Sequence, residues 1–119
     1  MNRNEFDAHC KTLPATTNVI QWGNASVWKV GGKIFAICSG WGEGTHEKFS
    51  FKCSDISYSL LIQQDGVIPA PYLARAKWVQ REDDSSVSDD DLKAYISAAH
   101  EIVARKLSKK LQKDLGLAD

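Results

Sequence analysis

The sequence predicts an α+β domain in which an antiparallel sheet has helices packed on one face. Apolar residues recur with helical spacing near both ends of the chain, and β-prone runs separated by short glycine turns fill its middle. Hairpins give antiparallel pairs, and helices at the chain ends can cover one face of such a sheet. At 119 residues the chain has the size of one domain, so we expect a two-layer sandwich formed by residues 1–119, with the second sheet face partly open.

The first element is predicted to be a short amphipathic helix over residues 2–13. Phe6, Cys10 and Leu13 are four and three residues apart, which places them on one helical stripe. Pro14 ends the run, because proline cannot continue a helix.

Three β-prone segments follow, at residues 19–22, 26–30 and 33–39. Gly31-Gly32 between the last two is typical of a two-residue hairpin turn, because glycine adopts the positive φ that this turn requires. In that register Trp28 lies opposite Phe35. Both faces of the hairpin carry apolar residues, which favours a position inside the sheet rather than at its edge.

The next predicted strand covers residues 48–53 and alternates between core and solvent. Phe49 and Phe51 point to the core, while Lys48, Ser50 and Lys52 are expected to face water. Ser54 then caps a helix over residues 55–64, prolines hold residues 67–73 extended, and residues 75–81 form a last strand.

The acidic run at residues 82–91 precedes the main C-terminal helix. Ser88 followed by three aspartates is what a helix N-terminus favours, so we prefer a capping role to a metal site. The helical stripe then continues through Ile96, Ala99, Val103 and Leu107, and Ser108 caps a final short helix that ends at Gly116.

Charge and cysteine content restrict the function classes. The net charge is zero, but residues 25–81 hold seven basic and four acidic residues, whereas residues 82–119 hold six basic and nine acidic ones. The three cysteines have no C-x-x-C spacing, which argues against a disulfide framework or a zinc site. With no apolar run of membrane-spanning length and no secretion signal, we expect a cytoplasmic protein that does not contact membranes.

Several spaced motifs together resemble the MmcQ/YjbR family of small bacterial proteins. They are Trp22-Gly23, "WKVGGKIFAI" from Trp28, "FSFKCS" from Phe49, "DGVIPAPYL" from Asp65, "AKWV" from Ala76 and "ARKLSKKL" near the C-terminus. The resemblance covers nearly the whole chain. It implies a fold similar to that of bacterial frataxin (CyaY) and a double-wing DNA-binding motif made by two β-hairpins.

The first wing would be the hairpin at residues 29–33, and the second the loop at residues 40–48. The second departs from an ideal wing, because Glu43 and Glu47 beside His46 would repel phosphate.

DNA binding through the open sheet face and the hairpin tips is therefore the leading hypothesis. The candidate contact residues are Trp28, Lys29, Lys33, Trp41, Lys48, Lys52, Arg75 and Lys77. Lysines would neutralise phosphates and an aromatic ring would pack on a sugar or base. The alternative is that these residues have only structural roles: the charged side chains face solvent, and the tryptophans belong to the core. A protein-interaction or regulatory module that uses Trp41 and Tyr72 on the same face is the second functional hypothesis.

Metal binding and catalysis have less support in the sequence. The first helix offers only Glu5 and Asp7 with His9 nearby, which falls short of the acidic ridge of frataxins, and the histidines lack ligand spacing. We find no nucleophile elbow, phosphate loop or paired carboxylates. The sequence therefore predicts a protein that is not an enzyme and that uses no cofactor or small-molecule substrate.

Overall fold

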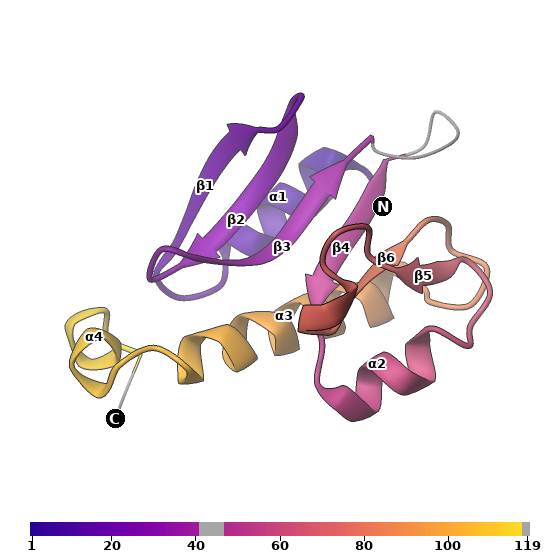
Figure 1. Ribbon diagram of the computed structural model, residues 1–119. Helices are drawn as coiled ribbons and strands as arrows, with labels where there is room; N and C mark the ends of the chain where they lie inside the picture. The colour runs from indigo at the N-terminus through magenta and orange to yellow at the C-terminus, as the bar shows by residue number, and fades with distance from the viewer. Residues whose placement is uncertain (41–46, 118–119) are drawn as a thin grey trace.

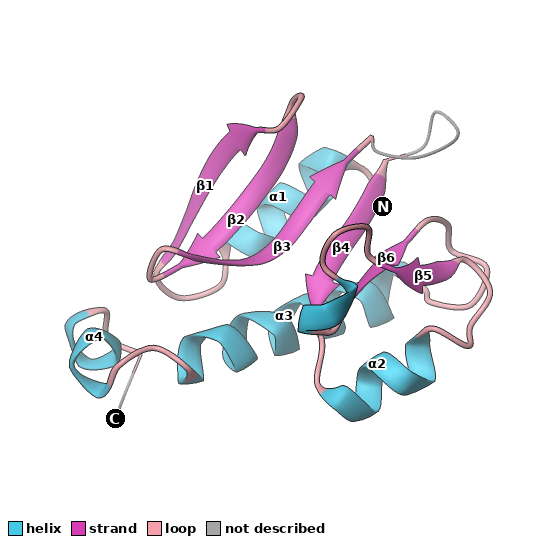
Figure 2. Cartoon of the chain, viewed as in Figure 1, coloured by secondary structure: helices cyan, strands magenta, loops and turns pink. Residues whose placement is uncertain are grey.

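The chain forms a six-stranded sheet with helices on one face (Figures 1 and 2). The computed structural model describes residues 1–40 and 47–117. In chain order the elements are α1 (Arg3–Lys11), β1 (Thr16–Gln21), β2 (Ala25–Val30), β3 (Lys33–Ser39), β4 (Lys48–Lys52), α2 (Asp55–Leu61), β5 (Val67–Pro69), the 3-10 helix η1 (Ala74–Ala76), β6 (Trp78–Arg81), α3 (Asp89–Arg105) and α4 (Lys109–Asp114).

The strand order across the sheet is β1-β2-β3-β4-β6-β5, and every neighbouring pair is antiparallel. The two-layer α+β class predicted from the sequence is confirmed. The β2–β3 hairpin lies inside the sheet, as its two apolar faces predicted. Within the described ranges, no helix combines the length and apolar character needed to cross a bilayer.

The helix α1 packs its apolar stripe on the sheet. A capping box starts it: the Asn2 side chain accepts a hydrogen bond from the Glu5 backbone, and the Glu5 carboxylate accepts one from the Asn2 backbone. Phe6 and Cys10 are fully buried, and the Phe6 ring lies 5.4 Å from that of Phe49. The sequence thus predicted this helix and its buried face correctly.

The long helix α3 crosses the same face (Figure 1). The Ser88 hydroxyl caps it by accepting a hydrogen bond from the Asp91 backbone, which supports the capping interpretation of the acidic run. Ile96 and Ala99 are buried against the sheet, and the His100 ring meets Phe35 edge-on at 5.2 Å.

The register predicted for the β2–β3 hairpin is wrong beyond Lys29, because the hairpin contains a β-bulge. Trp28 lies opposite Ala36, not Phe35, because the pairing shifts by one residue between Trp28 and Lys29. Phe35 and Ala36 consequently both join the core beneath the helices. A bulge permits this by leaving one residue of the longer strand unpaired.

The sheet face opposite α1 and α3 is more enclosed than predicted. A second apolar cluster occupies it, formed by Ala25, Val27, Ile37, Ala70 and Trp78. Ser50 and Lys48 are each only 2% exposed, so the expectation that this side of β4 faces water is wrong. β4 lies between β3 and β6, and residues 70–77 fold back over the neighbouring Trp78.

The last predicted strand also starts later than expected. β6 begins at Trp78, whereas Ala74–Ala76 form η1 and Lys77 adopts a left-handed backbone with φ of 63°. The Lys77 backbone N–H donates to the Ala74 carbonyl, so this segment turns instead of extending the sheet.

Candidate nucleic-acid interface

Six elements, β2, β3, β4, η1, α3 and α4, bring basic side chains to one end of the molecule. The β2–β3 turn, the last residue of β4 and the first residue of β6 share this end. Val30 pairs with Lys33 at the turn, Ala36 of β3 pairs with Phe51 of β4, and Lys52 pairs with Trp78. The C-terminal end of α3 reaches it too: a Cβ atom placed on Gly31 would lie 2.5 Å from the Leu107 side chain. We call this region the basic end and define it by Lys29, Lys33, Lys52, Arg75, Lys77, Arg105, Lys106, Lys109, Lys110 and Lys113.

The sheet part of the basic end is held by specific contacts. The Lys52 ammonium group donates to the Ala76 carbonyl, which ties the end of β4 to η1. The Lys77 ammonium group lies 4.9 Å from the centre of the Tyr58 ring, a cation–π contact with α2. Lys29 and Lys33 flank the β2–β3 turn, Lys29 half-buried and Lys33 exposed.

Electrostatic coupling shows that these cations are close together. Burial lowers the pKa of Lys52, and the positive charges of Lys106 and Lys77 lower it further, while Asp55 opposes them. Lys52 ends β4, whereas Lys106 follows α3 and Lys77 follows η1. Segments far apart in the sequence therefore form one electropositive region.

The helical half of the basic end is absent from the sequence-based candidates. The net charge summed over residues 82–119 is negative, yet most of the acids in this segment precede or begin α3, whereas most of its bases lie at the end of α3 and in α4. Asp89, Asp90 and Asp91 start α3, and Arg105 ends it, 17 residues or about 25 Å along the helix axis. The usable signal was the short stretch at residues 105–113, which holds five basic residues and no acid.

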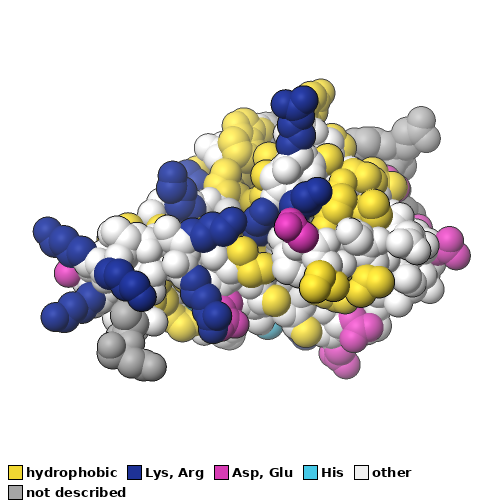
Figure 3. All heavy atoms as spheres, turned by 60° about the horizontal axis from the view of Figure 1, so that its bottom comes forward, with side chains coloured by type: hydrophobic (Ala, Val, Ile, Leu, Met, Phe, Trp, Pro, Cys, Tyr) yellow, Lys and Arg dark blue, Asp and Glu magenta, His cyan; other side chains and the backbone are white. Residues whose placement is uncertain are grey.

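Figure 3 shows the resulting separation of charge. Lysine and arginine side chains gather on the left and centre of this face, from α4 toward the sheet, and the charged side chains visible on the right are acidic. A few acids interrupt the basic end. Glu101 pairs with Arg105 one helical turn away, and Asp55 lies near Lys52.

A shallow groove of about 280 Å³ lies within the basic end. The Lys52 and Arg105 side chains line it together with Tyr95 and the start of α2. Glu101 also lines the groove and pairs with Arg105, so a phosphate there would compete with this carboxylate for Arg105. Lys52 and the Tyr95 ring offer a further phosphate contact and an aromatic surface.

The structure brings together five of the eight residues selected from the sequence: Lys29, Lys33, Lys52, Arg75 and Lys77. Trp28 is elsewhere, because its indole N–H donates to the Asp7 carboxylate at 2.9 Å beneath α1 and only 7% of the residue is exposed. Lys48 is buried at the opposite end of β4. Trp41 and most of the proposed second wing, including Glu43 and His46, lie outside the described residues.

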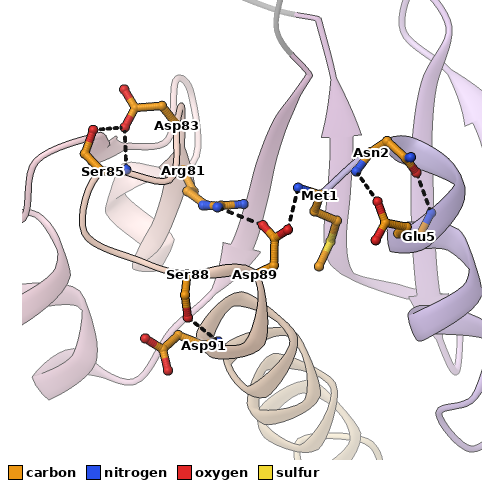
Figure 4. Close-up of polar contacts among 9 residues, drawn as sticks. All are labelled: Met1, Asn2, Glu5, Arg81, Asp83, Ser85, Ser88, Asp89 and Asp91. Carbon is orange, nitrogen blue, oxygen red and sulfur yellow. Dashed lines mark hydrogen bonds and ion pairs between the residues drawn. The ribbon is translucent and has the colours of Figure 1, made fainter.

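Acidic residues of positions 82–91 gather at the opposite end of the molecule, and Figure 4 shows some of their contacts. Asp83 accepts hydrogen bonds from the backbone and the hydroxyl of Ser85, and Asp89 accepts from Arg81 at 2.9 Å. In the described part of the chain, no group of three or more His, Cys, Asp or Glu residues is placed to hold a metal ion.

The residues considered for metal binding in the first helix have structural partners. Glu5 belongs to the capping box, Asp7 accepts from Ser26 and Trp28, and His9 hydrogen-bonds with Ser97 at 2.9 Å. These contacts join α1 to β2 and to α3.

Comparisons with known proteins identify the family. A Deinococcus radiodurans protein, DR2400, with the DUF419 domain, matches with a TM-score of 0.84 and 22% identity, over 98% of this chain and 88% of that one. A Pseudomonas syringae protein matches with a TM-score of 0.70 and 15% identity, over 87% of this chain and 99% of its own. At such identities the likeness shows the fold alone. No curated protein matches the sequence. The family model described as YjbR matches residues 11–102, most of the chain, and the chain therefore belongs to the YjbR family.

Proposed function

We propose that this protein binds DNA through the basic end and catalyses no reaction. The observation that carries the proposal is the convergence of cations from β2, β3, β4, η1, α3 and α4 on one end of the molecule. A polyanion is the ligand class that such a surface favours, because each phosphate contact releases condensed counterions.

The lysines position the duplex, and the β2–β3 turn serves as the wing. Gly31 and Gly32 leave the turn without side chains, so its backbone can approach a phosphate or a groove edge closely, with Lys33 next to it. Contacts to phosphates carry no sequence information. We therefore propose binding with little sequence preference and strong salt dependence.

The acidic residues at the opposite end support the proposal that the basic end faces DNA. Because Asp90 and Asp91 at the start of α3 lie about 20 Å from its C-terminal end, opposite charges are separated along the molecule despite its zero net charge. DNA is attracted to one end and repelled by the other. A neutral total charge is therefore compatible with binding.

Fluorescence anisotropy with a labelled duplex over a salt series tests the proposal. If about four phosphates are contacted, the logarithm of the affinity falls against the logarithm of the salt concentration with a slope of roughly −3 to −4. The double variant Lys52→Ala/Lys77→Ala tests the sheet half, and Lys106→Ala/Lys110→Ala tests the helical half. Each double variant should reduce the steepness of the slope by about two, which corresponds to two lost phosphate contacts.

Lys93→Ala is the matched control, because Lys93 lies on α3 but about 20 Å from Lys106 along the helix. It removes one positive charge outside the basic end and should bind like the parent protein. Absence of binding at low salt, or equal weakening by Lys93→Ala, would exclude DNA binding through the basic end.

A protein-interaction module is the second candidate, because one aromatic residue beside the basic end is fully exposed. Tyr72 protrudes from the segment that precedes η1 with a left-handed backbone, φ of 66°. An aromatic side chain in a polar surround is a common anchor at protein interfaces. A partner captured from lysate by the parent protein and lost with Tyr72→Ala, but kept with Lys52→Ala/Lys77→Ala, would favour this function over DNA binding.

We also propose that the protein acts in the bacterial cytoplasm without thiol chemistry. Cys10, Cys38 and Cys53 are free and buried, which suits a reducing compartment. Burial raises the pKa of Cys38 and of Cys53 to about 12, so both thiols stay protonated and weakly nucleophilic.

A further inference from the structure

The outer edge of β1 is a long and exposed sheet edge. β1 pairs only with β2 among the described strands, so alternate N–H and C=O groups along its other side point away from the sheet. In Figure 1 the strand lies at the margin of the sheet. Val19 is 37% exposed and Ile20 is 53% exposed. Such an edge can accept a further strand.

This edge lacks the features that normally prevent strand addition. Edge strands are usually short, charged, interrupted by proline or bulged. β5, at the other side of the sheet, has only three residues and ends in Pro69. β1 has six residues in uninterrupted register with β2, without proline or charge. The two edges therefore differ in the protection that they carry.

The charge pattern around β1 identifies the partner. Between Lys11 and Lys29 the chain contains no charged residue, although 30 of its 119 residues are charged. Across a two-fold axis the central residue faces its own copy and its neighbours face nearby residues of the same strand, so a charge at the axis would face the same charge. A neutral edge suits self-pairing, whereas recognition of a different charged strand would use complementary charges. Arg3 donates to the Asn24 carbonyl, beyond the end of the strand.

We propose that β1 pairs antiparallel with β1 of a second copy, around a two-fold axis at Val19. Directly opposed residues of an antiparallel pair point to the same face of the sheet. The two-fold axis must therefore lie midway between one residue and its own copy, because a register shifted by one residue would oppose side chains of different faces. Centring on Val19 places it beside its own copy and extends the apolar row from the buried Val27, its neighbour on β2. The two six-stranded sheets become one continuous sheet.

The interface is small, so the dimer is weak. Six residues of strand on each side bury less than the roughly 1,200 Å² typical of stable complexes. Sedimentation velocity from about 1 μM to about 1 mM covers the range in which such a contact dissociates. We expect a shift from monomer to dimer over that range, and a protein that stays monomeric throughout overturns the proposal. DNA is absent from this experiment, so its result does not depend on the proposed function.

Val19→Lys places two like charges at the axis and should leave the protein monomeric throughout the range. Ile56→Lys is the matched control, because Ile56 is an exposed apolar residue on α2, and this variant should dimerise like the parent. A dimer that survives Val19→Lys overturns the proposal.

Val19→Cys gives a second readout that does not require a charge. Since the native cysteines are buried, mild oxidation should give a disulfide-linked dimer with Val19→Cys and not with Ile56→Cys. Equal cross-linking of the two cysteine variants also overturns it.

Discussion

The buried Arg81 guanidinium of β6 donates to the Asp89 carboxylate at the start of α3, with 2.9 Å between Nη2 and Oδ1 (Figure 4). The second carboxylate oxygen of Asp89 accepts from the Met1 amino group at 2.8 Å. Arg81 is only 3% exposed. This contact therefore both fixes the beginning of α3 on the sheet and neutralises a charge that water cannot reach.

Asp89→Asn should destabilise the protein by about 1–2 kcal/mol. The variant leaves the Arg81 charge buried without a carboxylate, but the half-exposed position of residue 89 moderates the loss. Asp90→Asn, at an exposed position in the same helical turn, removes only a favourable interaction with the helix dipole and should cost less than about 0.5 kcal/mol. Urea denaturation of both variants measures the difference, and equal losses would contradict the role assigned to Asp89.

The same carboxylate predicts an acid-dependent loss of stability. The hydrogen bond from the Met1 amino group lowers the pKa of Asp89, burial opposes that shift, and the bond from Arg81 adds to it. Because the folded-state pKa lies below the unfolded value of about 3.9, this stabilisation is present above that value and is lost as the pH falls through the folded-state pKa.

Unfolding free energies from pH 7 to pH 2 test this dependence. The difference between the parent protein and Asp89→Asn should narrow below about pH 4, because a protonated Asp89 resembles asparagine. A difference that is constant with pH would show that charge at Asp89 contributes nothing.

Gly31→Ala should destabilise the basic end more than Gly32→Ala. Both glycines have positive φ, 57° and 80°, so either alanine is strained. Only the Cβ atom at residue 31 also collides with the Leu107 side chain, whereas the one at residue 32 meets nothing within 4 Å. We expect a loss of about 1 kcal/mol for Gly32→Ala and about 2 kcal/mol or more for Gly31→Ala. Thermal unfolding measures both, and equal losses would show that the turn does not pack on Leu107.

The sequence predicted those elements that depend on local patterns. The spacing of Phe6 and Cys10 identified α1, and the cap at Ser88 identified the start of α3. These features follow from side-chain periodicity and from backbone groups within a few residues. Each depends on neighbouring residues and not on distant parts of the chain.

Features decided by distant contacts were missed. The bulge at Phe35 depends on how two adjacent side chains fit beneath α3, and the turn at Lys77 depends on residues that cover Trp78. The sequence also failed to predict the helical half of the basic end, at the end of α3 and in α4, for a related reason. A helix of 17 residues separates the charges at its two ends in space, whereas a sum over the sequence cancels them.

The three cysteines should resist thiol reagents in the folded protein and limit stability in alkali. Burial raises the pKa of Cys10, and raises that of Cys38 and Cys53 to about 12, so these thiols stay protonated at pH 8. In the unfolded chain they ionise near pH 8.5. Stability from this source is therefore intact below about pH 8.5 and falls as the pH rises toward 12.

Reaction of the thiols with a chromogenic disulfide reagent at pH 8 should be at least about a hundredfold slower in buffer than in urea, where all three cysteines should react. One fast-reacting thiol in the native protein would mean that a cysteine opens to solvent far more often than its burial implies.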